Sequence, residues 1–302
     1  MTLQERLAEA RARLLVAGIR PSDAPLDVEL YARTILGWDR ARLLAEQRNP
    51  VPAGLEPRFS EWIARRERRE PSAYIVGVRE FWDLEFAVTP AVLIPRPETE
   101  FIVEEALRVL RESAREGGPT PARRVADIGT GSGCVAVAVA FECPTCRIVA
   151  SDVSAEALDI ARANAARHGV AERIEFVATS YLDDVDGMFD VITANPPYVK
   201  ERDKPVLSPD VRYEPDVALF GGAEGLRDIG GVLDAATEKL TPGGWLVMEF
   251  GYGQQDDVEA LLATRSGLRL DRVRDDLQGI ARTAIIQRRG PQHASALGWQ
   301  HQ

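Results

Sequence analysis

Residues 123–142, "RRVADIGTGSGCVAVAVAFE", carry the clearest indication of a fold in this 302-residue chain. A short run that ends in Val-Ala-Asp-Ile leads into three alternating glycines, and an Ala- and Val-rich run follows them. Glycine lets the backbone turn sharply and pass close to a ligand because it carries no Cβ. A helix that starts after such a loop exposes free N–H groups at its N-terminus. The stretch therefore predicts a strand, a ligand-binding loop and a helix.

Strands and helices alternate after this stretch. We expect strands at 147–153, 173–179, 189–195 and 242–250, and helices at 154–169 and 225–240. Two final strands are expected at 267–276 and 282–289. The alternation predicts an α/β fold with a Rossmann-like, doubly wound sheet of seven mostly parallel strands.

The first part of the chain has a different pattern. Leu3, Leu7, Ala10 and Leu14 recur at helical spacing, and prolines divide the region into several helices. We expect a small helical bundle domain at 1–77 and a β-hairpin linker at 78–97. The α/β domain then covers 98–289, and a disordered tail covers 290–302.

The charge balance of the chain indicates which classes of partner it can bind. The formal net charge is −10, which argues against a general grip on nucleic-acid phosphates. Residues 1–79 carry 14 Lys and Arg against 11 Asp and Glu, so the acidity lies in the remainder. The run "RRERR" at 65–69 is interpreted as a solvated helix face, with a basic docking surface as the alternative. No apolar run is long enough to span a bilayer, and the N-terminus lacks a signal-peptide core. We therefore expect a cytoplasmic monomer with no membrane partner and no direct nucleic-acid partner.

The three cysteines are Cys134, Cys143 and Cys146, an odd and small number that suits a reducing compartment. The Cys143–Cys146 spacing resembles a redox motif or half of a zinc site. A zinc site needs about four ligands and the chain has no second pair. The spacing is therefore interpreted as coincidence, and no metal is expected.

The glycine loop and the acids near it predict a nucleoside ligand. Asp152 ends the second strand, where it can accept hydrogen bonds from both ribose hydroxyls. Its alternative role is to cap the next helix, although Ser154 already suits that role. Asp127 can accept from a cationic amine or simply brace the loop. The G-x-G-x-G spacing and the lack of a pyrophosphate site favour S-adenosylmethionine over a dinucleotide. The predicted cofactor-binding residues are Asp127, Gly129, Thr130, Gly131, Ser132, Gly133, Asp152, Ser180, Tyr181 and Asn195, with Ser180 and Tyr181 on the adenine side.

The fourth strand ends in Asn195-Pro196-Pro197-Tyr198. The two prolines have no N–H, and their fixed φ angles stiffen the corner. The corner offers the Asn195 side-chain oxygen and backbone carbonyls as acceptors, and the Tyr198 ring as a flat wall. Two acceptors and a ring suit a planar group that bears an NH₂. These four residues are therefore the predicted catalytic residues, acting by positioning and electrostatics on a nitrogen that faces a sulfonium methyl. The alternative is that these four residues only form a turn that ends the strand.

These stretches resemble class I methyltransferases that act on planar NH₂ groups, which include adenine and protein-glutamine methyltransferases. The stretches "EFWDLEFAVTPAVLIPRPETE", "VRYEPDVALFGGAEGL" and "GGWLVMEFGYGQ" are similar to the peptide chain release factor glutamine methyltransferases. The resemblance covers roughly residues 1–288. The chain departs from the family pattern at Thr179-Ser180-Tyr181, where many members carry an acid and a bulky residue.

The resemblance implies methylation of the glutamine in the Gly-Gly-Gln motif of release factors, with S-adenosylmethionine as donor and 1–77 as the substrate-recognition domain. Asn195 would orient the glutamine amide, Pro196 would bind it through its carbonyl, and Tyr198 would pack on it. Arg96 and Glu98 would order the wall between the domains. Two alternatives remain: an adenine-amine methyltransferase on DNA or RNA, and a ligand-sensing or scaffold protein without enzymatic activity.

Overall fold

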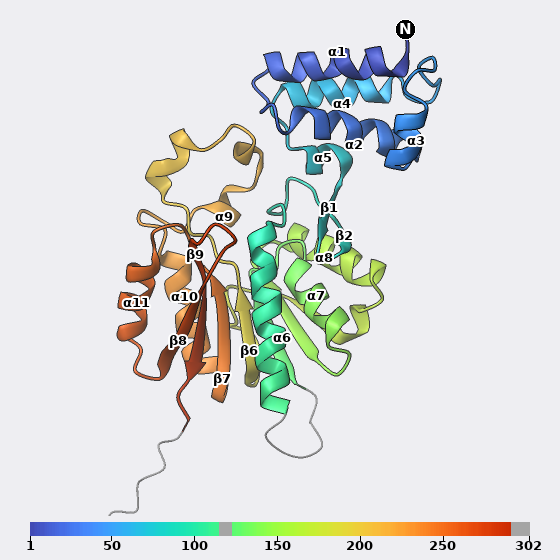
Figure 1. The fold of residues 1–302 in the computed structure, drawn as a ribbon. Coiled ribbons are helices and arrows are strands. Elements are labelled where there is room, and N and C mark those ends of the chain that lie inside the picture. Colours follow the sequence, from blue (N-terminus) through green and yellow to red (C-terminus); the bar gives the residue numbers. More distant parts are fainter. Residues whose placement is uncertain (115–122, 291–302) are drawn as a thin grey trace, which may run out of the picture. The chain divides into compact units, whose positions relative to one another are not determined.

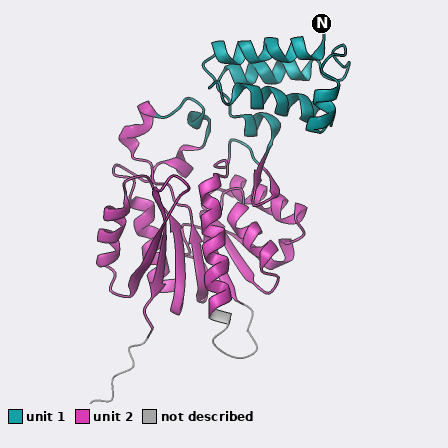
Figure 2. Cartoon of the chain, in the orientation of Figure 1, with its two compact units in different colours: residues 1–78, 88–90, 207–214 teal, residues 79–87, 91–206, 215–302 magenta. Residues whose placement is uncertain are grey.

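The computed structural model describes residues 1–114 and 123–290, so nearly all of the predicted tail lies outside the described residues. The chain divides into two compact units, drawn in two colours in Figure 2. The first unit comprises residues 1–78, 88–90 and 207–214, and the second comprises 79–87, 91–206 and 215–302. None of the described helices is both long enough and apolar enough to cross a membrane.

The second unit contains the predicted seven-stranded sheet, in the order β5-β4-β3-β6-β7-β9-β8 (Figure 1). The five strands from β5 to β7 are parallel, and β9 pairs antiparallel with both of its neighbours. The mostly parallel sheet expected from the sequence is therefore confirmed. The strands are β3 (Arg124–Ile128), β4 (Arg147–Asp152), β5 (Ile174–Ala178), β6 (Phe189–Ala194), β7 (Leu240–Glu249), β8 (Leu268–Asp275) and β9 (Ala281–Arg288).

Helices cover both faces of the sheet. Val125 belongs to a buried cluster with residues of α6 and α7, whereas its neighbour Ala126 belongs to a cluster with residues of α10 and α11. Alternate residues of a strand point to opposite faces, so near-continuous apolar strands are buried on both sides. The helices of this unit are α6 (Glu100–Ala114), α7 (Cys134–Glu142), α8 (Ala155–Arg167), α9 (Asp216–Leu219), α10 (Arg227–Lys239) and α11 (Gln255–Ala263).

Short elements connect these helices and strands. The predicted hairpin is present as β1 (Val78–Phe81) and β2 (Leu84–Ala87), which form a separate two-stranded sheet. The 3₁₀ helices η1 (Pro97–Thr99), η2 (Ala171–Arg173), η3 (Glu201–Val206) and η4 (Val211–Tyr213) were not predicted from the sequence. Such short segments carry too few residues to show a periodic pattern.

The first unit is a helical bundle with its own buried core, which includes Tyr31, Phe59 and Trp62. Its helices are α1 (Leu3–Val16), α2 (Ala24–Leu36), α3 (Arg40–Ala45), α4 (Arg58–Glu67) and α5 (Ser72–Val76). Thr2 caps α1 with a capping box, and Gly37 ends α2 in the left-handed region at φ 63°. The segment 207–214 belongs to this unit, although it lies far along the sequence from α1–α5.

The interpretation of 65–69 as a solvated face is wrong for Arg66. Arg66 is 5% exposed, and its Nε donates to Asp27 Oδ2 at 2.7 Å. Its Nη1 donates to Asp210 Oδ2 at 3.1 Å, and Arg69 Nε donates to the other oxygen of Asp210 at 2.6 Å. The partners Asp27 and Asp210 lie 39 and 144 residues from Arg66, so a local charge pattern could not reveal them.

Candidate active site

A cavity opens in the second unit at the carboxyl ends of β3, β4 and β6, where the strand order reverses its direction along the chain. Ligands of open α/β sheets bind at such a switch point. The predicted site residues that line the cavity are Asp127, Gly129, Thr130, Gly131, Ser132, Asp152, Tyr181, Asn195, Pro196 and Pro197. Arg96 also lines the cavity.

Four predicted residues are not in the cavity wall. Ser180 is exposed, and neither it nor Glu98 is among the lining residues. Gly133 faces α8, since a Cβ on it would lie 3.0 Å from the Cβ of Ala161. Tyr198, the last residue of the corner, is not among the lining residues, and its hydroxyl donates to the buried Glu249. The cofactor role of Gly133 and Ser180 and the wall-ordering role of Glu98 therefore stay predictions without support from the cavity.

The glycine loop presents bare backbone. Gly129 and Gly131 have φ angles of 68° and 56°, in the left-handed region that favours glycine. A Cβ on Gly129 would meet no atom within 4 Å, and one on Gly131 would meet only the Gly129 carbonyl at 4.0 Å. Both residues line the cavity, so the space that side chains would fill is open to a ligand.

Two carboxylates hold the loop, the buried Asp127 and the half-buried Asp152. Asp127 is 3% exposed and accepts from the hydroxyls of Thr130 at 2.6 Å and Thr193 at 2.8 Å. Burial raises the pKa of Asp127 to about 6, and the two hydroxyl donors oppose that shift. The bracing role considered for Asp127 is therefore present. Asp152 accepts from the N–H of Gly131 and of Ser154, both at 2.9 Å.

Asp152 does not cap α8. Ser154 does so, because its hydroxyl accepts from the N–H of Ala157 at 3.2 Å. Each Asp152 oxygen makes one hydrogen bond with the backbone, and a carboxylate oxygen can accept two. Asp152 is thus oriented by the loop and retains acceptor capacity toward the cavity that it lines.

Asn164 is a supporting residue that sequence reasoning missed. It is fully buried on α8, and its amide nitrogen donates to the carbonyls of Ser132 at 2.8 Å and Ala87 at 3.1 Å. Its oxygen accepts from the Ala87 N–H at 2.8 Å. One amide therefore ties the glycine loop to β2. The sequence offered one signal of this role, because Asn164 is a polar residue at a position that the apolar spacing of the helix places in the core.

Tyr181 forms the wall at the carboxyl end of β5. Its φ angle is 49°, and its hydroxyl donates to Asp228 of α10 at 3.0 Å. A Cβ on Gly231 would lie 2.1 Å from Tyr181 Cζ, so the ring packs directly on the bare backbone of α10. Burial and the nearby Asp228 charge raise the pKa of Tyr181 to about 12. Gly231 is therefore a second residue of the site that local sequence reasoning missed.

The Asn-Pro-Pro-Tyr corner is tied to buried residues behind it. The Asn195 amide nitrogen donates to the Thr99 hydroxyl at 3.0 Å, and Thr99 donates to Glu249 at 2.8 Å. The side chain of Gln254, 3% exposed, donates to the Tyr198 carbonyl at 3.1 Å. Thr99 comes from the "PRPETE" stretch, and Glu249 and Gln254 come from "VMEFGYGQ".

Two glycines let the chain pass close over the same corner. A Cβ on Gly221 would lie 2.3 Å from the Pro197 carbonyl oxygen. A Cβ on Gly225 would lie 2.2 Å from the Tyr198 carbonyl oxygen. Any other residue would push this segment away, which explains why the "GGAEG" stretch follows the corner.

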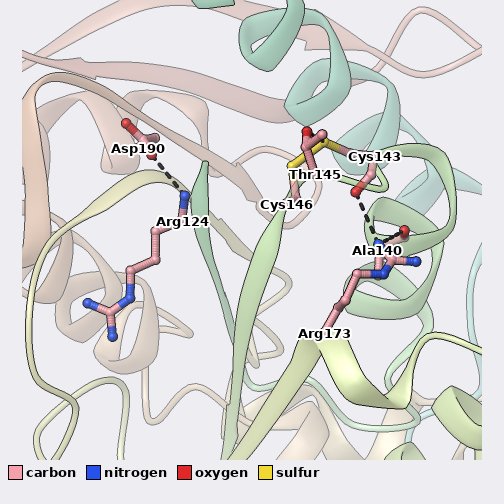
Figure 3. The surroundings of a disulfide bond; sticks show 7 residues. All are labelled: Arg124, Ala140, Cys143, Thr145, Cys146, Arg173 and Asp190. Atoms are coloured by element: carbon pink, nitrogen blue, oxygen red, sulfur yellow. Dashed lines mark hydrogen bonds between the residues drawn. A yellow bond between two sulfur atoms is a disulfide. The ribbon is translucent and has the colours of Figure 1, made fainter. Parts of the chain in front are cut away.

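The cysteine pair differs from the expectation of coincidence. Cys143 and Cys146 form a disulfide with Cα atoms 5.5 Å apart, at the turn between α7 and β4 (Figure 3). Cys143 is partly exposed and Cys146 is buried, while Cys134 is a free, buried thiol. Arg173 donates to the carbonyls of Ala140 and Cys143 and so holds the same turn. The described residues include no cluster of three potential metal ligands.

The fold and this site together define a class I methyltransferase. Residues 104–208 match the model of the methyltransferase small domain. The catalytic domain of human Mettl16, solved with an RNA hairpin, has the same fold with a TM-score of 0.55 and 14% sequence identity. That match covers 74% of this chain and 81% of the other.

The sequence comparisons then identify the family. Residues 5–77 match the PrmC N-terminal domain. The release factor glutamine methyltransferase of Nitratidesulfovibrio vulgaris is 42% identical over 95% of both chains. That of Bradyrhizobium diazoefficiens is 39% identical over 94% of this chain and 95% of the relative. The chain belongs to the release factor glutamine methyltransferase family.

Proposed function

We propose that this protein transfers a methyl group from S-adenosylmethionine to the side-chain amide nitrogen of the glutamine in the Gly-Gly-Gln motif of release factors. The observation that carries the proposal is the shared cavity. Asn195 and Pro196 line the same cavity as the bare glycine loop and Asp152. A nucleoside site and a receptor for a planar NH₂ group therefore lie side by side. The family membership supports release factors as the substrate class.

The residues on the nucleoside side fit S-adenosylmethionine. Gly129 and Gly131 leave open space next to the backbone, and Asp152 has acceptor capacity for ribose hydroxyls. Tyr181 provides an aromatic wall near the carboxyl end of β5. When bound, the cofactor supplies a methyl group on a positively charged sulfur.

The corner supplies the rest of the chemistry. An amide nitrogen is a poor nucleophile because its lone pair is delocalised into the carbonyl. The Asn195 side-chain oxygen and the Pro196 carbonyl can accept the two hydrogens of the amide, which aims the nitrogen and raises its electron density. No lysine or histidine is among the described residues that line the cavity. Positioning and electrostatics are the contributions that the two acceptors of the corner make to the rate.

The test uses tritiated S-adenosylmethionine with a release factor that carries Gly-Gly-Gln and with the same factor after Gln→Ala in that motif. We expect label in the first factor alone. Label in both, or in neither, would refute the proposal. Label transferred to adenine-containing DNA or RNA instead would establish the alternative activity.

The role of Asn195 is tested in the same assay. Asn195→Ala should lower kcat by about 100- to 1,000-fold, the usual cost of losing one preorganised polar group. The affinity for S-adenosylhomocysteine, measured by calorimetry, should stay within a few-fold. The exposed Asn49 offers a matched control, because Asn49→Ala removes the same side chain at a position whose only side-chain hydrogen bond among the described residues is local, to Glu46. An equal loss of rate and of cofactor affinity in Asn195→Ala would contradict the assigned role.

A further inference from the structure

A buried carboxylate lies behind the Asn-Pro-Pro-Tyr corner. Glu249 ends β7 and is 2% exposed. Its Oε2 accepts from the Thr99 hydroxyl at 2.8 Å, and its Oε1 accepts from the Tyr198 hydroxyl at 3.0 Å. A buried carboxylate is costly unless hydrogen bonds compensate it, and both of its donors belong to or touch the corner. Glu249 itself is not among the residues that line the cavity.

The direction of these hydrogen bonds sets the orientation of Asn195. A threonine hydroxyl has one hydrogen, and Thr99 gives it to Glu249. The Thr99 oxygen can then only accept from Asn195, so the amide nitrogen must face Thr99. The amide oxygen is left on the other side of the group. The two ends of an asparagine amide have nearly the same size, so shape alone cannot choose between the two orientations.

We propose that Glu249, acting through Thr99, is the positioning residue that makes Asn195 present an oxygen instead of an NH₂ to the substrate. The proposal rests on the proposed function, because a substrate NH₂ is the group that needs an acceptor. Glu249 also holds the Tyr198 hydroxyl, so one carboxylate sets two residues of the corner. We call the hydrogen bonds that run from Glu249 through Thr99 to Asn195 the relay. The relay selects substrates that bear an NH₂ over those that bear a carboxylate at the same place.

The relay can be reversed with little change in shape. In Glu249→Gln, the new amide offers one acceptor and one donor, so it cannot accept from both Thr99 and Tyr198. When its NH₂ faces Thr99, the Thr99 hydrogen must turn to Asn195. The Asn195 oxygen then faces inward, and its NH₂ faces the NH₂ of the substrate. Thr99→Val removes the relay altogether, whereas Thr99→Ser keeps the hydroxyl.

The experiment measures steady-state methylation of the Gly-Gly-Gln release factor by the full chain. Glu249→Gln and Thr99→Val should each lower kcat by about 10- to 100-fold, the range typical of removing the hydrogen-bond partners that orient metal ligands, whose supporting role is comparable. Thr99→Ser should restore most of the activity. Thermal unfolding and calorimetry with S-adenosylhomocysteine report on stability and cofactor affinity, which should change little in Thr99→Val.

Substrate selectivity gives a readout that a merely structural role would not move. The release factor with Gln→Glu in its motif serves as a competitive inhibitor, and its Ki is compared with the KM of the glutamine form. The ratio of Ki to KM should fall in Glu249→Gln, because a reversed Asn195 donates to a carboxylate. An unchanged ratio together with wild-type kcat in both relay variants would overturn the proposal. A loss of kcat in Thr99→Ser as large as the loss in Thr99→Val would also overturn the proposal.

The outcomes separate this inference from the proposed function. If the wild-type chain does not label the glutamine, the proposed function fails and the inference fails with it. If the wild-type chain labels the glutamine and the relay variants behave as wild type, only the inference fails. If Glu249→Gln does not fold, the kcat values of Thr99→Val and Thr99→Ser give the test: a loss in Thr99→Val alone supports the inference, and equal values in the two variants overturn it.

Discussion

Gly231→Ala tests the placement of Tyr181 in the cavity wall. A Cβ at this position would lie 2.1 Å from Tyr181 Cζ and 2.4 Å from its hydroxyl oxygen. These distances are far below van der Waals contact, so the ring or the helix must move. The neighbouring Gly230 is the matched control, because a Cβ there would meet only the end of Arg265 at 3.7 Å. Both glycines lie within α10 and are partly exposed.

The expected change in the free energy of unfolding follows from two opposing effects. Replacing glycine by alanine inside a helix stabilises it by about 1 kcal/mol. Overpacking costs about 1–3 kcal/mol. Gly230→Ala should therefore raise the unfolding free energy by about 1 kcal/mol, which corresponds to a Tm increase of about 2–4 °C. Gly231→Ala should be less favourable than this control by the overpacking cost.

That cost can appear in either of two measurements. If the ring keeps its place, Gly231→Ala lowers the Tm relative to Gly230→Ala. If the ring moves, the Kd for S-adenosylhomocysteine rises by about 5- to 150-fold, the equivalent of about 1–3 kcal/mol. Thermal unfolding and titration calorimetry on the two variants give both quantities.

Double variants test whether the Tyr181 ring is the source of this cost. In a Tyr181→Ala background the obstruction is absent, so Gly231→Ala and Gly230→Ala should have the same effect. If Gly231→Ala matches Gly230→Ala in both Tm and Kd in the wild-type background, the packing of Tyr181 on α10 is refuted.

Three further outcomes are expected. Because burial raises the pKa of Asp127 to about 6, the native state binds more protons than the unfolded state between about pH 4 and 6. The contribution of Asp127 to stability should therefore fall by up to about 3 kcal/mol as the pH rises through this window, and Asp127→Asn should make the pH slope in urea unfolding less steep. Reduction of the Cys143–Cys146 disulfide should cost about 2 kcal/mol, since it closes a loop of only four residues, and should leave the Kd for S-adenosylhomocysteine unchanged. Arg66→Ala should destabilise the first unit by about 3–5 kcal/mol because it leaves the buried carboxylate of Asp27 without its ion-pair partner, whereas Arg68→Ala at an exposed position should cost under about 0.5 kcal/mol in the same denaturation assay.

Each of these three has an outcome that contradicts it. A pH slope as steep in Asp127→Asn as in the wild type would mean that Asp127 does not titrate in this window. A Tm that responds to reductant in a Cys143→Ser, Cys146→Ser variant would mean that the disulfide is not the source. Equal losses in Arg66→Ala and Arg68→Ala would mean that the ion pairs of Arg66 are not buried.

The fold followed from the sequence where periodic patterns are long. The strands at 124–128 and 189–194 and the helix at 155–167 lie where apolar spacing and the Ser154 cap predicted them. The short helices α3, α5 and α9 were missed because a turn or two of helix has no periodic pattern. The course of residues 207–214 was also missed, since it depends on distant ion pairs.

By itself, the sequence determined the chemistry of the cavity. Glycines in a strand-loop-helix unit, an acid at the end of the next strand and the Asn-Pro-Pro-Tyr corner are local signals, because each acts through backbone geometry at its own position. Only the tertiary structure decided which hydrogen bonds and packing contacts hold these site residues in place. Thr99, Glu249 and Asn195 are separated by up to 150 residues, and only the folded sheet brings their hydrogen bonds together. The same holds for Gly231 and Tyr181, and for Arg66 and Asp210. Such contacts depend on three-dimensional distance, which no local pattern in the sequence records.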